Sequence, residues 1–325
     1  MLILNPQETR AALPMPELIQ AMKEAYAALT LGKAQVPLRS RLEIPPHEGT
    51  TLLMPAYVQT ETEEALAVKI VSLFPGNPAR GLAFIQAAVL ALEPDTGRPL
   101  ALMDGAVLTA RRTGAASGAA TDLLARPDSR VAAIFGAGTQ ARTQLEAVCT
   151  VRPIEEAWIY DPDTARLEAY LNEMQPQVSA RLRAAQSPRQ AVAEADIICT
   201  ATTATAPVFE DAALKPGVHI NGVGSYTPQM VELPPETLRR AAVFVDSREA
   251  VLAEAGEIIA ALREEMLSPE GLTELGAVAA GQAPGRRDEA QITVFKSVGV
   301  AVQDALATQV ALKHAQSFHP QAKRQ

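Results

Sequence analysis

The chain has 325 residues and a formal net charge of −8 at pH 7; 48% of its residues are hydrophobic and 20% are charged. This length predicts two domains, each with enough sequence to build its own core. The acidic balance and an aromatic content of 4% argue against nucleic-acid binding. No apolar run is long enough to span a bilayer, and the first residues lack the basic region of a signal peptide. We therefore expect neither a membrane segment nor export.

Cysteine and histidine are too sparse to build a disulfide framework or a metal site. The two cysteines, Cys149 and Cys199, each lie in an apolar segment, where a buried thiol is the usual outcome. The four histidines have no metal-ligand spacing; they are His47, His219, His314 and His319. We therefore expect a reduced, cytoplasmic protein without a bound metal.

The first third of the chain predicts one helix and then an antiparallel sheet. Apolar residues recur with helical spacing from Pro16 to Leu31, where a glycine ends the pattern. Strand-like runs divided by Pro, Gly and Asn follow at residues 39–44, 49–54, 66–71 and 83–92. Asp95-Thr96-Gly97 has the composition of a hairpin turn. A further helix, rich in small residues, is expected over 108–124, with Arg111 and Arg112 near its start.

Near the middle of the chain, a buried strand runs into a G-x-G-x-x-A turn and the start of a helix. In such a turn Gly136 allows the tight bend, Gly138 lets the backbone approach a pyrophosphate, and Ala141 permits close helix packing. The N-terminus of the helix, with Thr139 and Gln140, offers N–H groups to the phosphates. This pattern predicts a dinucleotide-binding unit.

A second apolar strand, residues 157–160, ends in Asp161. This position is close to the spacing, about 20 residues, expected for a carboxylate that binds a ribose 2′-hydroxyl. The alternative role for Asp161 is the N-cap of the next helix, which Asp163 or Thr164 can supply instead. No Arg or Lys precedes Arg166 to receive a 2′-phosphate. We therefore predict NAD(H) as the cofactor, with NADP(H) as the alternative.

Apolar strands alternate with helical segments after the glycine turn, at residues 196–199, 219–223 and 242–246. This alternation predicts a doubly wound parallel sheet, which is a Rossmann-type α/β fold. A last helix, from Val298 to Leu312, is expected to pack onto the N-terminal domain. The predicted organisation is therefore a discontinuous α+β domain, residues 1–115 with 300–325, and an NAD-binding Rossmann domain, residues 116–299.

Further motifs occur in one order along the chain and are similar to those of a known family. They are Leu102-Met103-Asp104-Gly105, the run LTARRTGAAS at residues 108–117, the glycine turn, and TVFKSVG at residues 293–299. The chain thus resembles the ornithine cyclodeaminase/μ-crystallin family over nearly its whole length. The resemblance implies that the discontinuous domain binds substrate and forms a homodimer. It also implies action on imines or amino acids with a nicotinamide cofactor.

The resemblance extends to individual site residues. Arg41, Lys69 and Arg112 match the family residues that hold the substrate carboxylate, and an arginine can bind a carboxylate bidentately. A lysine among apolar neighbours and two guanidiniums would have a lowered pKa, which suits proton transfer. Strand alternation alone instead favours Lys69 on the solvent face of a half-buried strand. Residue types alone do not choose between Arg111 and Arg112, because either fits a surface position on its helix.

The expected cofactor site extends beyond the glycine turn to the next three apolar strands. Its residues are Gly136, Gly138, Thr139, Gln140, Ala141, Asp161, Thr200 and Val223.

One departure from the cyclodeaminase pattern bears on the substrate. Cyclodeaminases carry an Asp after Asn-x-x-Gly, where this chain has Tyr226 within NGVGSYTP, residues 221–228. A phenol is neutral at pH 7 and cannot anchor an ammonium as a carboxylate does, which argues against ornithine cyclisation. This version of the motif is similar to branches that reduce cyclic imines or act as ketimine reductases. The alternative is a simple glycine turn in which Ser225 and Thr227 bond the backbone.

The leading hypothesis is NADH-dependent reduction of Δ1-pyrroline-2-carboxylate or Δ1-piperideine-2-carboxylate to L-proline or L-pipecolate. Arg41 and Arg112 would bind the carboxylate, and Lys69 would protonate the imine nitrogen or keep it protonated. Tyr226 or Ser225 would order a water molecule. The alternatives are an ornithine cyclodeaminase or alanine-type amino-acid dehydrogenase, and a non-catalytic, nucleotide-dependent binding protein similar to μ-crystallin.

Overall fold

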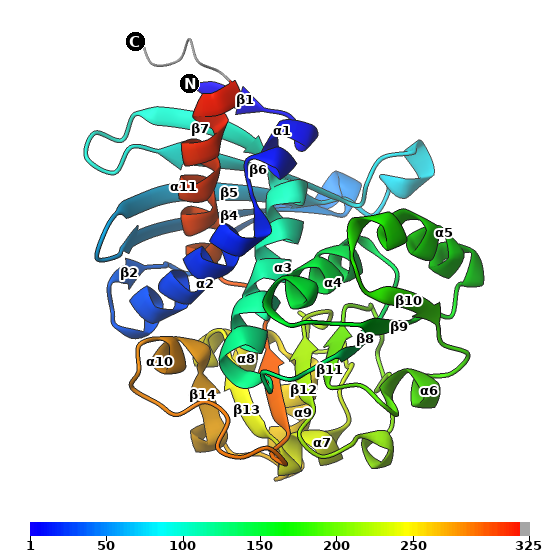
Figure 1. Cartoon of the computed structure of the whole chain (residues 1–325). Helices are drawn as coiled ribbons and strands as arrows, with labels where there is room; N and C mark the ends of the chain where they lie inside the picture. The colour runs from blue at the N-terminus through cyan, green and yellow to red at the C-terminus, as the bar shows by residue number, and fades with distance from the viewer. Residues whose placement is uncertain (319–325) are drawn as a thin grey trace. The chain divides into compact units, whose positions relative to one another are not determined.

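The computed structural model describes residues 1–318, and the chain divides into two compact units (Figure 1). Unit 1 joins Met1–Arg112 to the C-terminal segment that begins at Val300, and unit 2 is Thr113–Gly299. His319 and residues 320–325 of the predicted C-terminal segment lie outside the described residues. In the described part of the chain, no helix combines the length and the apolar character needed to cross a membrane.

Unit 1 is built on a mostly antiparallel sheet with the strand order β1-β7-β6-β5-β4-β2, in which β3 also pairs with β4. The terminal pair β1 and β7 is parallel. The antiparallel arrangement predicted from alternation is confirmed, and β4 continues past the predicted end through Pro55. The strands are β1 (Leu2–Leu4), β2 (Ala34–Gln35), β3 (Ser40–Ile44), β4 (Gly49–Gln59), β5 (Glu64–Leu73), β6 (Ile85–Leu92) and β7 (Pro99–Asp104).

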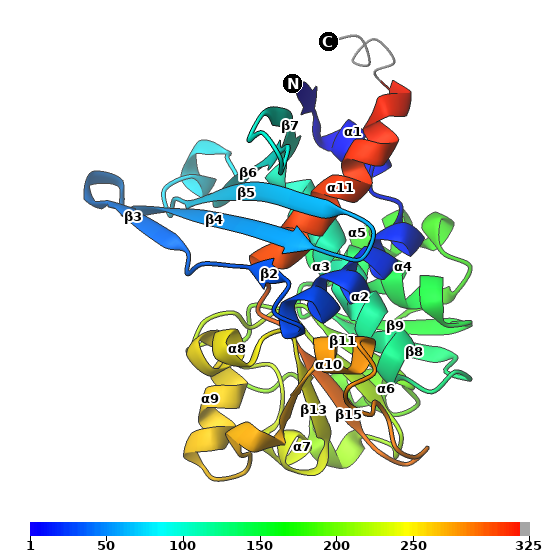
Figure 2. The same cartoon turned by 90° about the vertical axis from the view of Figure 1, so that its left-hand side faces the viewer.

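Helices cover one face of this sheet. The C-terminal helix α11 (Ala301–Phe318) packs on β4, β5 and β6, as Figure 2 shows, and α2 (Met15–Thr30) packs against α11. The predicted return of the last helix to the N-terminal domain is thus observed. The short helix α1 (Pro6–Ala11) begins with a capping box between Asn5 and Glu8. Two 3-10 turns, η1 (Pro45–His47) and η2 (Pro78–Arg80), follow β3 and β5.

Strand register decides which side chains face α11. Lys69 lies opposite Met54 on β4 and Val89 on β6, and all three side chains are buried. Leu53 and Ile70, one position away on the same strands, point to the other face and are 42% and 38% exposed. The face away from α11 therefore presents exposed apolar side chains.

Unit 2 contains a wholly parallel sheet with the strand order β10-β9-β8-β11-β12-β15-β13-β14. The first strand, β8, lies between β9 and β11, so the order reverses beside it, and ligands of such sheets bind at the carboxyl edge of a reversal. The predicted Rossmann-type sheet is confirmed. The strands are β8 (Val131–Phe135), β9 (Glu156–Tyr160), β10 (Arg181–Ala184), β11 (Ile197–Thr200), β12 (His219–Gly222), β13 (Ala242–Val245), β14 (Leu272–Glu274) and β15 (Thr293–Lys296).

Both faces of this parallel sheet are apolar. On β8, Ala132 and Ile134 join one buried cluster, and Ala133 and Phe135 join the other. A strand buried on both faces reads as a continuous apolar run, which is how β8 appears in the sequence. The helices are α3 (Gly105–Leu124), which begins in unit 1, α4 (Thr139–Val151), α5 (Thr164–Met174), α6 (Pro188–Val192), α7 (Pro235–Arg240), α8 (Arg248–Glu254), α9 (Gly256–Arg263) and α10 (Leu275–Ala279), with 3-10 turns η3 (Gln175–Gln177), η4 (Asp211–Ala213) and η5 (Pro269–Gly271).

Candidate functional site

The turn between β8 and α4 has the geometry of a phosphate cradle. Gly136 has a φ of 96°, and a Cβ on it would lie 2.7 Å from the carbonyl oxygen of Ala201, so the position requires glycine. A Cβ on Gly138 would meet no atom within 4 Å, which shows open space beside the turn. Helix α4 begins at Thr139 without a side-chain cap. These features fit a dinucleotide pyrophosphate, which helix N–H groups would bind.

Two polar side chains at the start of α4 support this assignment. Gln140 Oε1 is buried and accepts no hydrogen bond from any residue that the structure describes. A buried acceptor without a partner is uncommon, and a bound ligand is one way to supply the missing donor. Arg142 donates to the carbonyl oxygens of Ala137, at 2.8 Å, and Gly138, at 3.0 Å, and pairs with Glu173 at 2.6 Å. Arg142 thereby fixes the turn from the helix side.

Asp161, at the end of β9, is tied directly to the glycine turn. Its Oδ2 accepts the N–H of Ala137 at 2.8 Å, and its Oδ1 accepts the N–H of Asp163 at 2.9 Å. Asp163, not Asp161, caps α5, because its Oδ1 accepts the N–H of Arg166 at 3.0 Å. The alternative capping role of Asp161 is therefore excluded. Arg166 Nη1 lies 3.9 Å from Asp161 Oδ2, so a cation stands beside the ribose-binding candidate.

The two other predicted cofactor residues lie at the carboxyl edge of neighbouring strands. Thr200 ends β11, Val223 follows β12, and the N–H of Val223 donates to the carbonyl oxygen of Thr200 at 3.0 Å. The Thr200 hydroxyl donates to Glu232 Oε2 at 2.9 Å. Because this hydroxyl is engaged by a buried carboxylate, any contact of Thr200 with a cofactor would rest on its position at the sheet edge.

Glu232 holds the loop after β12 through hydrogen bonds from the loop backbone. It is fully buried, and its oxygens accept the N–H and hydroxyl of Thr202, at 2.6 and 2.8 Å, and the N–H groups of Gly224 and Ser225, at 2.7 and 3.2 Å. Burial raises the pKa of Glu232, while Lys296 and the two hydrogen bonds from Thr202 act in the opposite direction. The backbone of the Gly224–Ser225 segment is therefore held by a carboxylate rather than by solvent.

A second buried group, Lys296, holds the same loop. Its Nζ donates to the carbonyl oxygen and to Oγ of Ser225, both at 2.7 Å, and lies 3.2 Å from Glu257 Oε1. The Ser225 hydroxyl in turn hydrogen-bonds Glu257 Oε2. Ser225 is fully buried in this network, so the predicted use of its hydroxyl to order a catalytic water does not fit. Tyr226, the next residue, is 42% exposed.

In unit 1, Lys69, Arg112 and Asp304 form a buried ion cluster, which we call the Asp304 cluster. Lys69 Nζ lies 2.7 Å from Asp304 Oδ2, and Arg112 Nε lies 3.1 Å from Asp304 Oδ1. Arg112 Nη1 also donates to Gln303 Oε1 at 2.7 Å, and Gln303 Nε2 donates to the Tyr26 hydroxyl at 2.7 Å. Two cations share one carboxylate, which leaves one positive charge in excess.

The environment of Lys69 differs from the solvent face that alternation alone favours. Its side chain is 3% exposed and faces α11, because that helix covers this side of the sheet. The pKa of Lys69 is lowered to about 8, chiefly by burial; Arg112 and Arg39 add to this lowering, and Asp304 opposes it. A pKa of this value suits proton transfer.

The remaining candidate arginines differ in their surroundings. Arg41, with its side chain 65% exposed, forms an ion pair with Glu43. It lies opposite Leu52, two positions from Met54, so it shares the sheet face of Lys69. Arg111 is buried and donates to the carbonyl oxygen of Leu13 at 3.1 and 2.6 Å. A surface role for Arg111 is therefore wrong.

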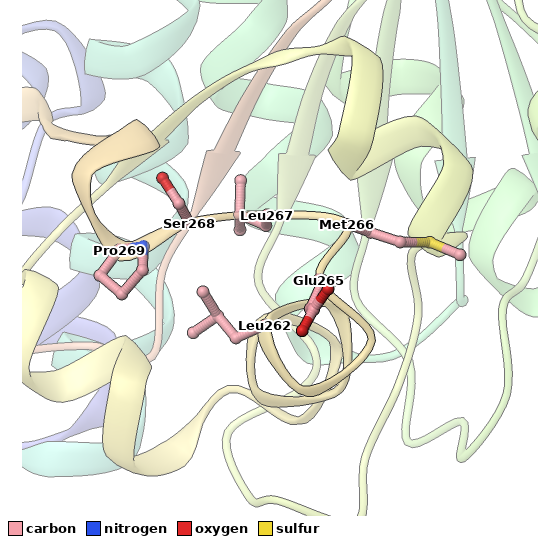
Figure 3. Close-up of a pocket in the computed structure, with 6 residues that line it drawn as sticks. All are labelled: Leu262, Glu265, Met266, Leu267, Ser268 and Pro269. Carbon is pink, nitrogen blue, oxygen red and sulfur yellow. The ribbon is translucent and has the colours of Figure 1, made fainter.

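Two surface pockets have linings that share no residue with these clusters. The pocket in Figure 3, of about 450 Å³, is lined by residues between Leu262 and Pro269 at the end of α9. Its lining is largely apolar and includes the carboxylate of Glu265. A pocket of about 730 Å³ in unit 1 is lined by the η1 turn and by Arg80 and Gln86, among others. Neither lining includes a residue predicted to bind substrate or cofactor.

A profile of the ornithine cyclodeaminase/mu-crystallin family matches residues 2–317. The chain belongs to this family. It is 37% identical to the Δ1-pyrroline-2-carboxylate reductase of Bacillus cereus, over 97% of each chain. The family resemblance inferred from the motifs is thus confirmed.

Two solved structures of family members are close to this one in sequence and fold. One is the Thermococcus litoralis Δ1-pyrroline-2-carboxylate reductase in complex with NADH and L-proline, with 43% identity, 98% coverage of each chain and a TM-score of 0.91. The other is an archaeal alanine dehydrogenase dimer with bound NAD, with 33% identity, coverage of 98% of this chain and 97% of that chain, and a TM-score of 0.88. The nicotinamide dinucleotides in both agree with the predicted type of cofactor.

Sequence reasoning missed Asp304, the residue that joins two of the three predicted carboxylate ligands. A signal was present, because Asp304 is the one charged residue in the otherwise uncharged stretch 301–312. A lone carboxylate in an apolar helix is rarely buried without a cationic partner. The partners, Lys69 and Arg112, are too distant in sequence to be recognised from spacing.

Proposed function

We propose that this chain is an NADH-dependent reductase of cyclic α-imino acids, acting on Δ1-pyrroline-2-carboxylate or Δ1-piperideine-2-carboxylate to give L-proline or L-pipecolate. The observation that carries the proposal is the Asp304 cluster, whose excess positive charge would be matched by one substrate carboxylate. Because its side chains are almost fully buried, that attraction would be little screened by water. The similarity to two Δ1-pyrroline-2-carboxylate reductases supports the same substrate class.

Within this proposal, unit 1 binds the imino acid. Arg112 and Arg41 hold the substrate carboxylate, and Gln303 fixes the Arg112 guanidinium through Nη1. Lys69, in its ammonium form, donates a proton to the imine nitrogen or keeps that nitrogen protonated, which makes C2 electrophilic. The resulting Lys69 amine then regains a proton from solvent.

Unit 2 binds the dinucleotide in the same proposal. The pyrophosphate would be held by the start of α4 and by the turn that contains Gly136 and Gly138. Asp161 would accept hydrogen bonds from the ribose hydroxyls. Bound NADH would supply the hydride that reduces the C=N bond. Asp161 favours NADH because its charge would repel a 2′-phosphate, whereas the nearby Arg166 is the group that would tolerate NADPH.

The test is NADH oxidation by the purified protein with each imine in separate reactions, followed by the loss of NADH absorbance, with NADPH compared in parallel. Turnover of either imine with formation of the L-amino acid is expected. Tight NADH binding without turnover of either imine would contradict the proposal and favour a nucleotide-dependent binding protein.

The similarity to an archaeal alanine dehydrogenase favours one second candidate, an amino-acid dehydrogenase that uses the same cations to bind a 2-oxo acid. Pyruvate and ammonium with NADH would then yield alanine at a rate above that of imine reduction. Ornithine cyclisation is disfavoured because Tyr226 replaces the cyclodeaminase Asp, and ammonia release from ornithine with NAD tests that directly.

We also propose a homodimer formed through the exposed face of the unit 1 sheet. Leu42, Leu53 and Ile70, on three neighbouring strands, share this face by register and are each 38% to 64% exposed. A patch of this kind usually marks an interface, and a similar protein is a dimer. Ile70→Glu should give a monomer in light scattering, whereas Leu31→Glu, at the end of α2, should remain dimeric. A wild-type monomer would contradict the proposal.

We propose a cytoplasmic location, as the sequence suggests. In support, Cys149 and Cys199 are free thiols, and Cys199 is buried, which suits a reducing compartment. Fractionation with antibody detection tests this, and recovery outside the cytoplasm would contradict it.

A further inference from the structure

Asp304 is placed between the two cations that the proposed function assigns to substrate. Its two oxygens are divided between them: Oδ2 lies 2.7 Å from Lys69 Nζ, and Oδ1 lies 3.1 Å from Arg112 Nε. The residue is 1% exposed, and the next residue toward the N-terminus, Gln303, accepts a hydrogen bond from Arg112 Nη1. One turn of α11 therefore orients both cations.

We infer that Asp304 is a positioning residue of the reaction, which holds the Lys69 ammonium in place in its charged form so that Lys69 can act as the proton donor. This inference rests on the proposed function, because it concerns the donor that imine reduction needs. Asp304 itself transfers no proton in this scheme. The proton passes from Lys69 to the imine nitrogen, and Lys69 takes another from solvent.

The charges that act on Lys69 come from three parts of unit 1. Asp304 on α11 is an anion, whereas Arg112 on α3 and Arg39, before β3, are cations. The cross-strand neighbours on β4 and β6, Met54 and Val89, carry no charge. Without Asp304, the buried amine would face two guanidiniums, and its charged form would be strongly disfavoured.

The pKa of Lys69 reflects the same balance. Burial lowers it most, Arg112 and Arg39 lower it further, and Asp304 opposes all three, which leaves the pKa at about 8. At neutral pH Lys69 is thus charged in the native protein. Loss of the Asp304 charge should lower this pKa by about 1–3 units, the usual effect of one close opposite charge.

The experiment compares wild-type protein with Asp304→Asn, which keeps the side-chain shape, and with Thr308→Val as a matched control on the same helix. The Thr308 hydroxyl is buried and donates only to the nearby Ala305 carbonyl oxygen among its described hydrogen bonds. Two quantities are measured: the NMR titration of the Lys69 ¹³Cε resonance, assigned by its loss in Lys69→Met, and the pH profile of kcat/KM for imine reduction.

In Asp304→Asn we expect the Lys69 titration midpoint and the alkaline limb of kcat/KM to move together, by about 1–3 pH units toward acid. Both should stay unchanged in Thr308→Val. An unmoved midpoint in folded Asp304→Asn would overturn the inference, as would an alkaline limb that stays in place while the midpoint moves. A merely structural role for Asp304 would lower activity equally at every pH.

Two further comparisons cover an Asp304→Asn variant that does not fold and a wild-type protein that does not reduce the imines. If Asp304→Asn does not fold, the double variant with Lys69→Met should recover the fold, because it no longer buries an uncompensated pair of cations. Failure of that rescue would overturn the inference. Wild-type protein that binds NADH but reduces neither imine would overturn the proposed function instead, while the NMR midpoints still decide whether Asp304 holds the Lys69 charge.

Discussion

The backbone N–H of Ala137 donates to Asp161 Oδ2 at 2.8 Å, so the glycine turn and the carboxylate at the end of β9 are fixed to each other. The group that would bind the ribose is thus set in register with the group that would bind the pyrophosphate. Coenzyme preference can therefore be tested by changing Asp161 alone. The hydrogen bond also means that Asp161 cannot be truncated without disturbing the turn.

Asp161→Asn should shift coenzyme preference toward NADPH. The amide oxygen can still accept the Ala137 N–H, while the negative charge that repels a 2′-phosphate is gone. The ratio of kcat/KM for NADPH to that for NADH should rise about tenfold or more, since Arg166 then has only the Asp163 carboxylate beside it instead of two. Asp163→Asn, which removes a charge two residues away and keeps an N-cap, is the control. An equal shift in both variants would contradict the role of Asp161.

Alanine at the two turn glycines should have different effects on the stability of the free protein. Gly138→Ala places a methyl in open space, so stability should not change, but NADH binding should weaken by about 1–3 kcal/mol. Gly136→Ala forces a Cβ against the Ala201 carbonyl at a positive φ, and should lower the free energy of unfolding by more than about 1 kcal/mol. Calorimetric NADH titration and urea unfolding separate the two. Normal NADH affinity in Gly138→Ala would show that the backbone at this turn does not bind the pyrophosphate.

The neighbouring arginines on α3 give a matched pair for substrate binding. Arg112→Gln should cost about 2–5 kcal/mol of transition-state stabilisation, measured as a loss in kcat/KM for the imine, chiefly through a higher KM. The reason is that the substitution deletes one cation of the Asp304 cluster. Arg111→Gln should lower stability, because the buried Leu13 carbonyl loses its donor, yet leave KM unchanged. Steady-state kinetics on folded variants decide between them, and a KM effect confined to Arg111→Gln would reverse the assignment.

The Lys296–Glu257 pair should dominate the stability of the loop after β12. Lys296→Met leaves the Glu257 carboxylate and the Ser225 carbonyl buried without their cation, and should lower the free energy of unfolding by about 3–5 kcal/mol. Adding Glu257→Gln should restore part of this loss, since the unpaired charge is removed. Urea unfolding followed by circular dichroism measures both variants. Additive losses in the double variant would show that the two groups are not coupled.

Imine reduction should be limited at alkaline pH by Lys69. Its pKa is lowered to about 8, and only the ammonium form donates a proton, so kcat/KM should be level below that pH and fall above it. NADH affinity, measured separately, should show no such limb, because the turn residues that would bind it carry no group of this kind. A profile that is level through about pH 10 would exclude Lys69 as the donor.

Local motifs made much of unit 2 predictable from sequence. The tight bend at Gly136, the packing of Ala141 and the acid at the strand end all depend on a few neighbouring residues, and the structure places them accordingly. The same holds for the antiparallel strands of unit 1, because alternation of apolar and polar residues indicates a strand with one buried face.

The surroundings of single side chains were less predictable. Alternation alone favoured Lys69 on the solvent face of β5, but the covered face holds Lys69, and Ile70 is 38% exposed. The cover and the counter-ion Asp304 both come from α11, at the other end of the chain. Likewise, the sequence predicted that Ser225 orders a water molecule or bonds the backbone of a glycine turn, because its partners Glu257 and Lys296 are distant in sequence.

The most direct test of the central proposal is NADH oxidation with Δ1-pyrroline-2-carboxylate by wild-type protein and by Lys69→Met, measured side by side. We expect turnover to L-proline by the wild type and a loss of about 10²–10⁴-fold in kcat in the variant, the usual contribution of a positioned proton donor. Equal kcat and KM in the two proteins, or no turnover by a wild type that binds NADH, would contradict the account.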